Sequence, residues 1–127
     1  MKMRTLIFLI LLTVLGSCKK EDYRIKYTGN FYFTTDLKTF ITDTTFTDSI
    51  TQFHGFISLA SESDKISIHS LPNVTFETRV NEDGGLPDPN IGAMGGGFGG
   101  HFIGTDSITF GSFVMLSFIS QTKGKRE

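Results

Sequence analysis

Apolar and polar side chains alternate along most of the chain after residue 26. In the run from Tyr27 to Thr34, for example, Tyr27, Gly29, Phe31 and Phe33 share one face at a period of two. This period is typical of β-strands, in which successive side chains point to opposite faces of the sheet. The alternation predicts strands over residues 27–34, 37–42, 50–59, 65–69, 74–80, 101–103, 108–110 and 113–120.

Short segments rich in Gly, Pro, Asn, Asp and Ser separate the predicted strands. Helix-forming residues are scarce, since only two alanines, Ala60 and Ala93, follow residue 18. Seven or eight short strands joined in this way favour an all-β fold, an antiparallel up-and-down meander. We expect a small barrel rather than a sandwich, spanning residues 27–120, with a lumen that phenylalanine side chains largely fill.

Residues 1–17 have the composition of an export signal rather than of part of the fold. A positively charged start with Lys2 and Arg4 precedes an apolar run of ten residues from Leu6 to Leu15. A helix of that length reaches about 15 Å, which is half of the roughly 30 Å hydrocarbon core that a transmembrane helix crosses. The segment is therefore predicted to be a signal peptide, which is removed from the mature protein.

The sequence Leu15-Gly16-Ser17-Cys18, at the end of the apolar run, resembles a bacterial lipobox. The resemblance implies that signal peptidase cuts between Ser17 and Cys18, and that Cys18 carries the acyl chains that anchor the protein in a membrane. It also accounts for the single cysteine, which would otherwise be a free thiol in an exported protein. Residues 18–26 are then expected to form a lipidated tether.

The tripeptide Lys20-Glu21-Asp22 follows the predicted lipidation residue closely. A lysine followed by two acidic residues in this place is similar to the export signal of small surface lipoproteins of Bacteroidetes. The resemblance implies an outer-membrane lipoprotein that faces the cell exterior. The same residues would also suit an ordinary solvated tether, so both interpretations stay open at this point.

The chain that remains after removal of residues 1–17 is mildly acidic, with 10 basic and 13 acidic residues. Its basic residues are scattered, apart from those in residues 121–127, which we expect to form a frayed basic C-terminal tail. Nucleic acid is therefore not an expected partner, because neutralising phosphates requires clustered Lys and Arg on a folded surface.

Candidate chemistry is sparse, and neither a cofactor nor a metal is expected. Residues 95–100 satisfy the G-x-G-x-x-G pattern, but a dinucleotide site requires a helix after the glycines, where this sequence predicts strand and turn. The histidines, His54, His69 and His101, lack metal-ligand spacing and are expected to point outward from their strands. The sequence contains no G-x-S-x-G motif. We therefore expect a protein that is not an enzyme.

Two functions from different classes are compatible with this sequence. The one we favour is a structural or interaction module at the cell surface, which contacts a protein partner through the glycine-rich segment 92–100 and through residues 113–120, apolar on both faces. The other follows from Gly29-Asn30-Phe31, which resembles the Gly-x-Trp start of lipocalin-like barrels with Phe in place of Trp. This resemblance implies a small apolar ligand in the barrel mouth near Tyr27, Phe31 and Phe53.

Overall fold

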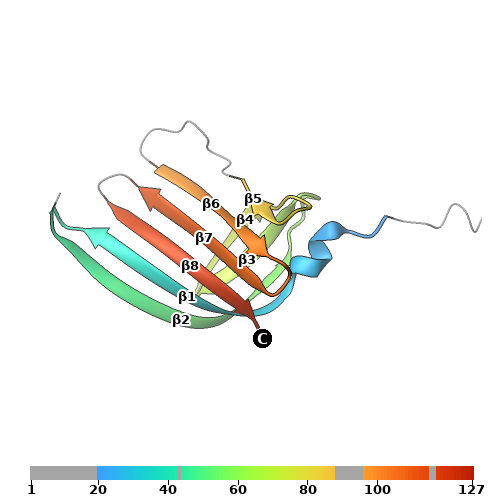
Figure 1. The fold of residues 1–127 in the computed structure, drawn as a ribbon, viewed down its shortest axis with the longest axis horizontal. Coiled ribbons are helices and arrows are strands. Elements are labelled where there is room, and N and C mark those ends of the chain that lie inside the picture. The colour runs from blue at the N-terminus through green and yellow to red at the C-terminus, as the bar shows by residue number, and fades with distance from the viewer. Residues whose placement is uncertain (1–19, 43, 88–95, 115–116) are drawn as a thin grey trace, which may run out of the picture.

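Most of the chain forms one curved antiparallel sheet in the computed structural model, which describes residues 20–42, 44–87, 96–114 and 117–127. A short 3₁₀ helix, η1 (Tyr23–Tyr27), precedes the sheet. The strands are β1 (Gly29–Phe40), β2 (Phe46–Leu59), β3 (Lys65–Leu71), β4 (Val74–Arg79), β5 (Gly85–Leu86), β6 (Gly96–Ile103), β7 (Ser107–Val114) and β8 (Phe118–Arg126). In Figure 1, β2, β1, β8, β7 and β6 run side by side, and β3 and β4 lie behind them.

The sheet is an up-and-down meander that is nearly closed into a barrel. Its strand order is β4-β3-β2-β1-β8-β7-β6-β5, so the first and last strands pair with each other and β4 and β5 form the two edges. Side chains bridge the gap between the edges, because the ring of Phe76 on β4 lies 5.9 Å from Phe98 and 5.5 Å from Phe110. The prediction of an all-β, up-and-down barrel rather than a sandwich is confirmed.

The core of the barrel follows the alternation seen in the sequence. Phe31, Phe33 and Thr35 of β1 face the lumen and are at most 4% exposed. Burial of such aromatic rings stabilises the fold by roughly 25 cal/mol per Å² of apolar surface. The lumen is so full that the facing strand needs a small residue, since a Cβ on Gly124 would lie 2.7 Å from the ring of Phe33 and 2.8 Å from Ile108.

The predicted boundary between the first two strands is wrong. Residues 27–34 and 37–42 were expected as separate strands, but β1 pairs with β2 without a break from Gly29 to Phe40. The interruption in the sequence pattern comes from Asp36, a charged residue on the outer face of β1. The strand continues past Asp36 because its backbone pairs with β2 on one side and with β8 on the other as far as Thr39.

The expectation of one strand over residues 113–120, apolar on both faces, is also wrong. This segment contains the end of β7, a turn at Ser117 and the start of β8. Phe113 lies opposite Ile119, and Val114 lies opposite Phe118, so the apolar residues form two cross-strand pairs. Two apolar residues before a tight turn and two after it give the same sequence pattern as one strand with two apolar faces.

The expected tail, residues 121–127, is the second half of β8, and this is a further correction. Its backbone pairs with β1 as far as Arg126 and with β7 as far as Lys125, and Thr122 is only 2% exposed. The expected tether, residues 18–26, likewise includes most of η1, in which Arg24 is buried. Few residues of either segment are apolar, which is why both were expected to lie outside the fold. In residues 121–127, small or polar Thr122 and Gly124 suit the crowded lumen.

The two ends of the barrel differ. At the η1 end, where η1 and Arg126 lie, the Arg126 guanidinium is 4.9 Å from the ring centre of Phe31 and donates to the carbonyl oxygens of Thr28 at 2.7 Å and Lys26 at 2.9 Å. The opposite end, which we call the open end, carries the β1–β2 and β7–β8 turns (Figure 1). Arg126 therefore closes the barrel on the side where the chain enters the fold.

Strands β2 and β3 approach each other closely at Gly55 of β2. A Cβ at this position would collide with the carbonyl oxygen of His69 on β3, so only glycine permits the two backbones to approach this closely. On the C-terminal side of Gly55, β3 pairs with Phe56–Leu59 only, whereas β1 pairs with β2 along the whole of β1. Within the described chain, residues 46–54 thus have a strand neighbour on one side alone.

Candidate functional site

The residues of the predicted lipidation and export signals lie at or before the start of the described chain. Ser17 and Cys18 are outside the described residues. Lys20 is exposed and lies 3.6 Å from the carboxylate of Glu82, and Glu21 is also exposed. Asp22 begins η1 as its N-cap, and side-chain hydrogen bonds from Arg24 hold the pKa of the Asp22 carboxyl below its usual value. Asp22 therefore has a structural role, whatever its role in export.

The structure does not place an open mouth at the three residues expected to bind a ligand. Tyr27 is 3% exposed, stacks on Phe102 with ring centres 4.3 Å apart, and donates its hydroxyl to the Glu82 carbonyl oxygen at 2.9 Å. Phe31 is fully buried beneath Arg126. Phe53 is half-buried and does not join the other two, because its ring packs against His69. Tyr27 and Phe31 are thus part of the closed η1 end of the core, which corrects this expectation.

The three histidines lie in separate surroundings. His54 is exposed and hydrogen-bonds Glu127, and His101 is exposed on β6, so both point outward as predicted. His69 also lies on the outer face, alternating with the buried Ile68 and Ser70 of β3, but it is half-buried there, and its Nδ1 lies 2.8 Å from the Thr75 hydroxyl. Among the described residues, no three His, Cys, Asp or Glu side chains come close enough together to hold a metal ion.

A cavity of about 220 Å³ lies inside the barrel, between the β3–β4 hairpin and strands β6 to β8. Its lining is uncharged and consists of Ser70, Leu71, Val74, Phe76, Phe98, Phe110, Ser112, Ser120 and Thr122. The cavity is on the open-end side of the packed core, because Ser112 and Ser120 follow Phe110 and Thr122 toward the β7–β8 turn. We call it the inner cavity.

Apolar and polar groups occupy different parts of the inner cavity. Its apolar wall consists of three rings with centres 5.5 to 6.1 Å apart, those of Phe76, Phe98 and Phe110. Its hydroxyl groups lie mainly on β7 and β8, where Ser112 is directly opposite Ser120. The Thr122 hydroxyl is 2.9 Å from that of Thr35, so this pair is already satisfied by its own hydrogen bond. The serines are the groups that remain to face a ligand.

The sequence contained a signal for the inner cavity that the predicted strand boundaries hid. Ser112 and Ser120 face the lumen because each is two residues from a lumen-facing neighbour, Phe110 or Thr122. With residues 113–120 taken as one strand and 121–127 as a tail, neither serine had a partner across the sheet. The correct turn at Ser117 places the two serines opposite each other.

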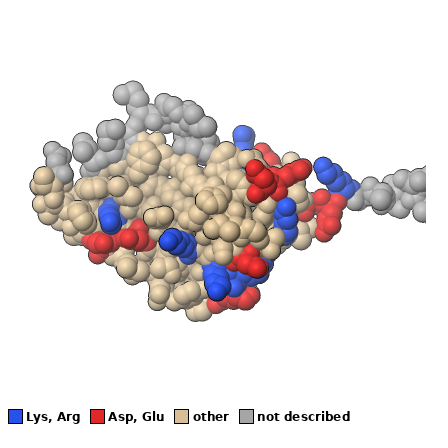
Figure 2. Space-filling model, in the orientation of Figure 1, with Lys and Arg blue, Asp and Glu red and all other residues tan. Residues whose placement is uncertain are grey.

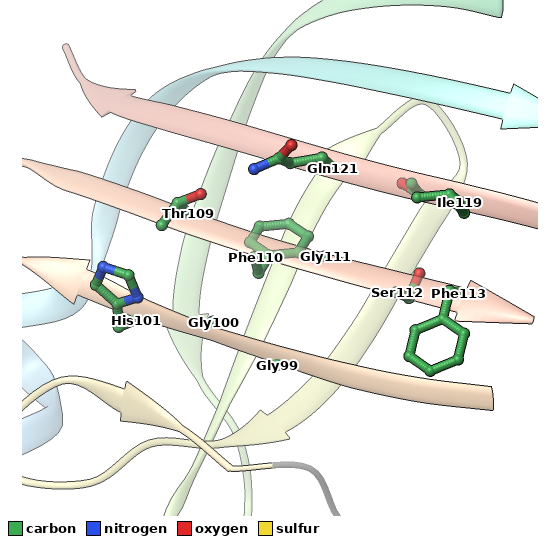
Figure 3. Close-up of a pocket in the computed structure, with 11 residues that line it drawn as sticks. Gly99, Gly100, His101, Thr109, Phe110, Gly111, Ser112, Phe113, Ile119 and Gln121 are labelled. Carbon is green, nitrogen blue, oxygen red and sulfur yellow. The ribbon is translucent and has the colours of Figure 1, made fainter.

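A hollow of about 370 Å³ lies on the outer face of β6, β7 and β8 (Figure 3). Its floor is bare backbone, because Gly99 of β6 and Gly111 of β7 face each other across the sheet. Phe113 and Ile119 lie at one end of the hollow (Figure 3). Thr109 lies toward the other end, beside His101. We call this hollow and its neighbour, described next, the outer groove.

The neighbouring hollow, of about 420 Å³, shares Thr109 and continues along the outer face toward the η1 end. Its lining includes two lysines of β8, Lys123 and Lys125, and hydroxyl-bearing residues of β1 and β7. Figure 2 shows that charged side chains follow the lower rim and the η1 end of this face, and that the middle, over β6 and β7, is uncharged. The outer groove therefore leads from an apolar end to a basic end.

A pair of carboxyl groups, Asp36 and Asp48, lies on the outer face of β1 and β2. A hydrogen bond between them, with burial adding to it, raises the pKa of Asp36 above its usual value. The Oδ1 atom of Asp36 is buried and has no hydrogen-bond partner in the described chain. A proton shared by the two groups would satisfy this atom.

The chain matches no family model, no curated protein and no solved structure. In the part of the chain that the structure describes, no helix has the length and apolar character needed to cross a bilayer.

Proposed function

We propose that the chain is a lipid-anchored, non-enzymatic binding protein of the outer membrane, and that it holds a small uncharged ligand in the open end of its barrel. The observation that carries the ligand proposal is the inner cavity, which combines three phenylalanine rings with hydroxyl groups and no charge. Such a lining suits a ligand with one flat apolar face and one hydroxyl or carbonyl group. A volume of about 220 Å³ favours a ligand of one or two rings.

The anchor proposal rests on the lipobox-like residues 15–18 and on the place where the fold begins. The helix η1 begins at Tyr23, five residues after Cys18, and five residues of extended chain span about 18 Å at most. A lipid on Cys18 would therefore hold the η1 end near the bilayer. The open end lies on the opposite side of the barrel (Figure 1), so the inner cavity would face away from the membrane.

Replacement of Cys18 by alanine is expected to release the protein from membranes and to abolish its labelling with radioactive palmitate, because the acyl chains would have no attachment site. The measurement is the distribution of the full-length protein between membrane and soluble fractions of the cell, together with the label. Ser17→Ala, which keeps a small residue before the cysteine, should leave both unchanged. Labelling of Cys18→Ala at the wild-type level would contradict the anchor.

The ligand proposal predicts that 1-naphthol, a flat apolar molecule with one hydroxyl, binds in the inner cavity. Its fluorescence is readily observed because the chain has no tryptophan. Ser112→Leu, which fills the cavity from β7, should weaken this binding at least tenfold. Ser67→Leu is the matched control, because Ser67 is on the outer face of β3 between the buried Ile66 and Ile68. Equal binding to both variants would contradict the proposal.

A protein partner is the second candidate, and the surface of the open end favours it. On the outer face, Phe46, Ile50, Phe113 and Ile119 are 45 to 68% exposed. In the described chain, residues 46–54 of β2 have no strand neighbour on the side away from β1, and an extended segment of a partner could pair with this edge. Native mass spectrometry of the chain from Glu21 on, purified from its own cells, separates the candidates: a copurifying small molecule supports the first and a copurifying polypeptide the second.

A further inference from the structure

We infer that the outer groove is a second binding site, whose ligand is an organic anion with a flat apolar body. This inference goes beyond the proposed function, because the inner cavity and the outer groove lie on opposite faces of β7. Outward-facing Thr109 and Gly111 line the groove, whereas the Phe110 ring forms part of the wall of the cavity. The groove carries two lysines at one end and a flat glycine floor toward the other.

The basic end is built from Lys123 and Lys125 of β8. Both point outward, since the intervening Gly124 faces the rings in the lumen. Neither lysine forms an ion pair with an acidic residue of the described chain. Two like charges about 7 Å apart along one strand face, without a counter-ion, repel each other and attract an anion.

Hydroxyl groups flank each lysine on the two neighbouring strands. Lys125 lies opposite Tyr32 of β1 and Ser107 of β7. Lys123 lies opposite Thr34 of β1, and Thr109 of β7 lies on its other side. Ammonium and hydroxyl groups both donate hydrogen bonds, and donors of this kind bind phosphate, sulfate or carboxylate oxygens strongly when one partner is charged.

Carboxylates near the η1 end do not neutralise the two lysines. Glu127 is bound to His54, and Asp106 is 3.6 Å from the Arg126 guanidinium. Both carboxylates thus lie against residues other than the two lysines. The lysines keep their charge available to an anionic ligand.

The flat shape of the groove depends on Gly99. Other glycines of the sheet are explained by crowding, since a Cβ on Gly100 or Gly124 would overlap a neighbour. A Cβ on Gly99 would meet no heavy atom within 4 Å, and its backbone is not left-handed. Glycine weakens a strand, yet the fold does not require one here. Its effect is to leave, opposite Gly111, a flat floor between Phe113 and the lysines.

The probe for this site is 1-naphthyl phosphate, and 1-naphthol is the same ring system without the anion. The experiment uses the full lipidated chain in nanodiscs of phosphatidylcholine, which has no net charge. We expect 1-naphthyl phosphate to bind at least tenfold more tightly than inorganic phosphate, which lacks the apolar body. Its affinity should also fall as salt is raised, because the lysines are exposed to solvent. Equal affinity for inorganic phosphate would overturn the role of the glycine floor.

Two variants locate the site. The double variant Lys123→Gln/Lys125→Gln should weaken 1-naphthyl phosphate binding at least tenfold, and Lys38→Gln, on the same outer face of the neighbouring strand β1, should leave it unchanged. Gly99→Leu should weaken it to a similar extent without lowering Tm, because its side chain enters the empty groove. Wild-type affinity in either of these two site variants would overturn the proposal.

The variant Ser112→Leu distinguishes this site from the inner cavity. It should weaken the binding of 1-naphthol and leave that of 1-naphthyl phosphate unchanged. Ser112 borders both hollows, but its side chain alternates with those of the outward-facing Gly111 and Phe113 and therefore enters the inner cavity. Loss of 1-naphthyl phosphate binding in Ser112→Leu, with no loss in Gly99→Leu, would place the anion inside the barrel and overturn the outer site. Failure of 1-naphthol to bind at all would count against the inner cavity alone.

Discussion

Removal of residues 121–127 is expected to abolish the cooperative unfolding transition of the protein. These residues are the second half of β8, which lies between β1 and β7 and joins the first strand of the barrel to the last hairpin. Without them, Phe31 and Phe33 would lose their cover on one side, and Arg126 could no longer close the η1 end. A marginally stable domain of this size does not survive the loss of a central strand.

The measurement is thermal unfolding followed by circular dichroism, with the chain ended at Ser120. The double variant Lys123→Gln/Lys125→Gln is the control, because it removes two exposed charges and keeps the strand. It should melt cooperatively, within a few degrees of the wild type, as substitutions of exposed side chains usually do. If the truncated chain melts like the wild type, these residues are a tail, as their composition alone indicated, and the pairing of β8 is wrong.

The sequence was sufficient to predict the fold class and to identify the residues of β1 that face the core. The alternation of Phe31 and Phe33 with polar neighbours directly reflects which face is buried, because one face of an antiparallel strand packs on the core and the other meets water. Closure of the barrel could not be read from the sequence. It depends on β1 pairing with β8, about 90 residues later in the chain, and local patterns carry no information about such distant pairs.

The inner positions of β8 show why the end of the domain was missed. A lumen-facing residue is normally identified by an apolar side chain, but Thr122 and Gly124 are polar or small. Gly124 must be small because Phe33 and Ile108 fill the space in front of it, and Thr122 can be buried because its hydroxyl is paired with that of Thr35. Residue size at an inner position is thus set by the neighbour across the barrel, and that neighbour is known only once the register is known.

Both candidate sites depend on the register in the same way. The inner cavity requires Ser112 opposite Ser120, and the outer groove requires Gly99 opposite Gly111. The glycine-rich segment was noticed in the sequence, but its meaning differs from residue to residue: Gly100 is crowded by its neighbours, whereas Gly99 is not. The residues expected to bind a ligand, Tyr27 and Phe31, were selected for their size, which is the property that also fills a core.

Replacement of Arg24 by alanine is the substitution expected to destabilise the fold most. Arg24 is 7% exposed. The two hydrogens of its Nη1 are shared among three carbonyl oxygens at the β2–β3 connection, those of Ala60 at 3.2 Å, Glu62 at 2.6 Å and Lys65, the first residue of β3, at 2.7 Å. Its Nη2 and Nε bind the carboxylate of Asp22. Loss of one partner of a buried, charged network costs about 3 kcal/mol, which lowers Tm by roughly 15 °C in a domain of this size.

The effect of Arg24→Ala should depend on pH in a direction set by Asp22. Arg24 lowers the pKa of Asp22 in the folded protein from its usual 3.8, so this contribution to stability is complete above that pH and is lost as the pH falls through the lowered pKa. The difference in Tm between wild type and Arg24→Ala should therefore narrow under strongly acidic conditions. It should not vanish, because the bonds to the three carbonyl oxygens do not titrate.

Lys26→Ala is the matched control for Arg24→Ala, since Lys26 is an exposed basic residue of the same helix. It should change the free energy of unfolding by about 0.5 kcal/mol or less. Equal Tm values for the two variants would show that η1 belongs to the flexible tether. A large loss confined to Arg24→Ala means instead that the domain begins at Asp22, four residues after Cys18. Anchor and barrel would then be separated by only about 14 Å of extended chain, which restricts how far the open end can turn back toward the membrane.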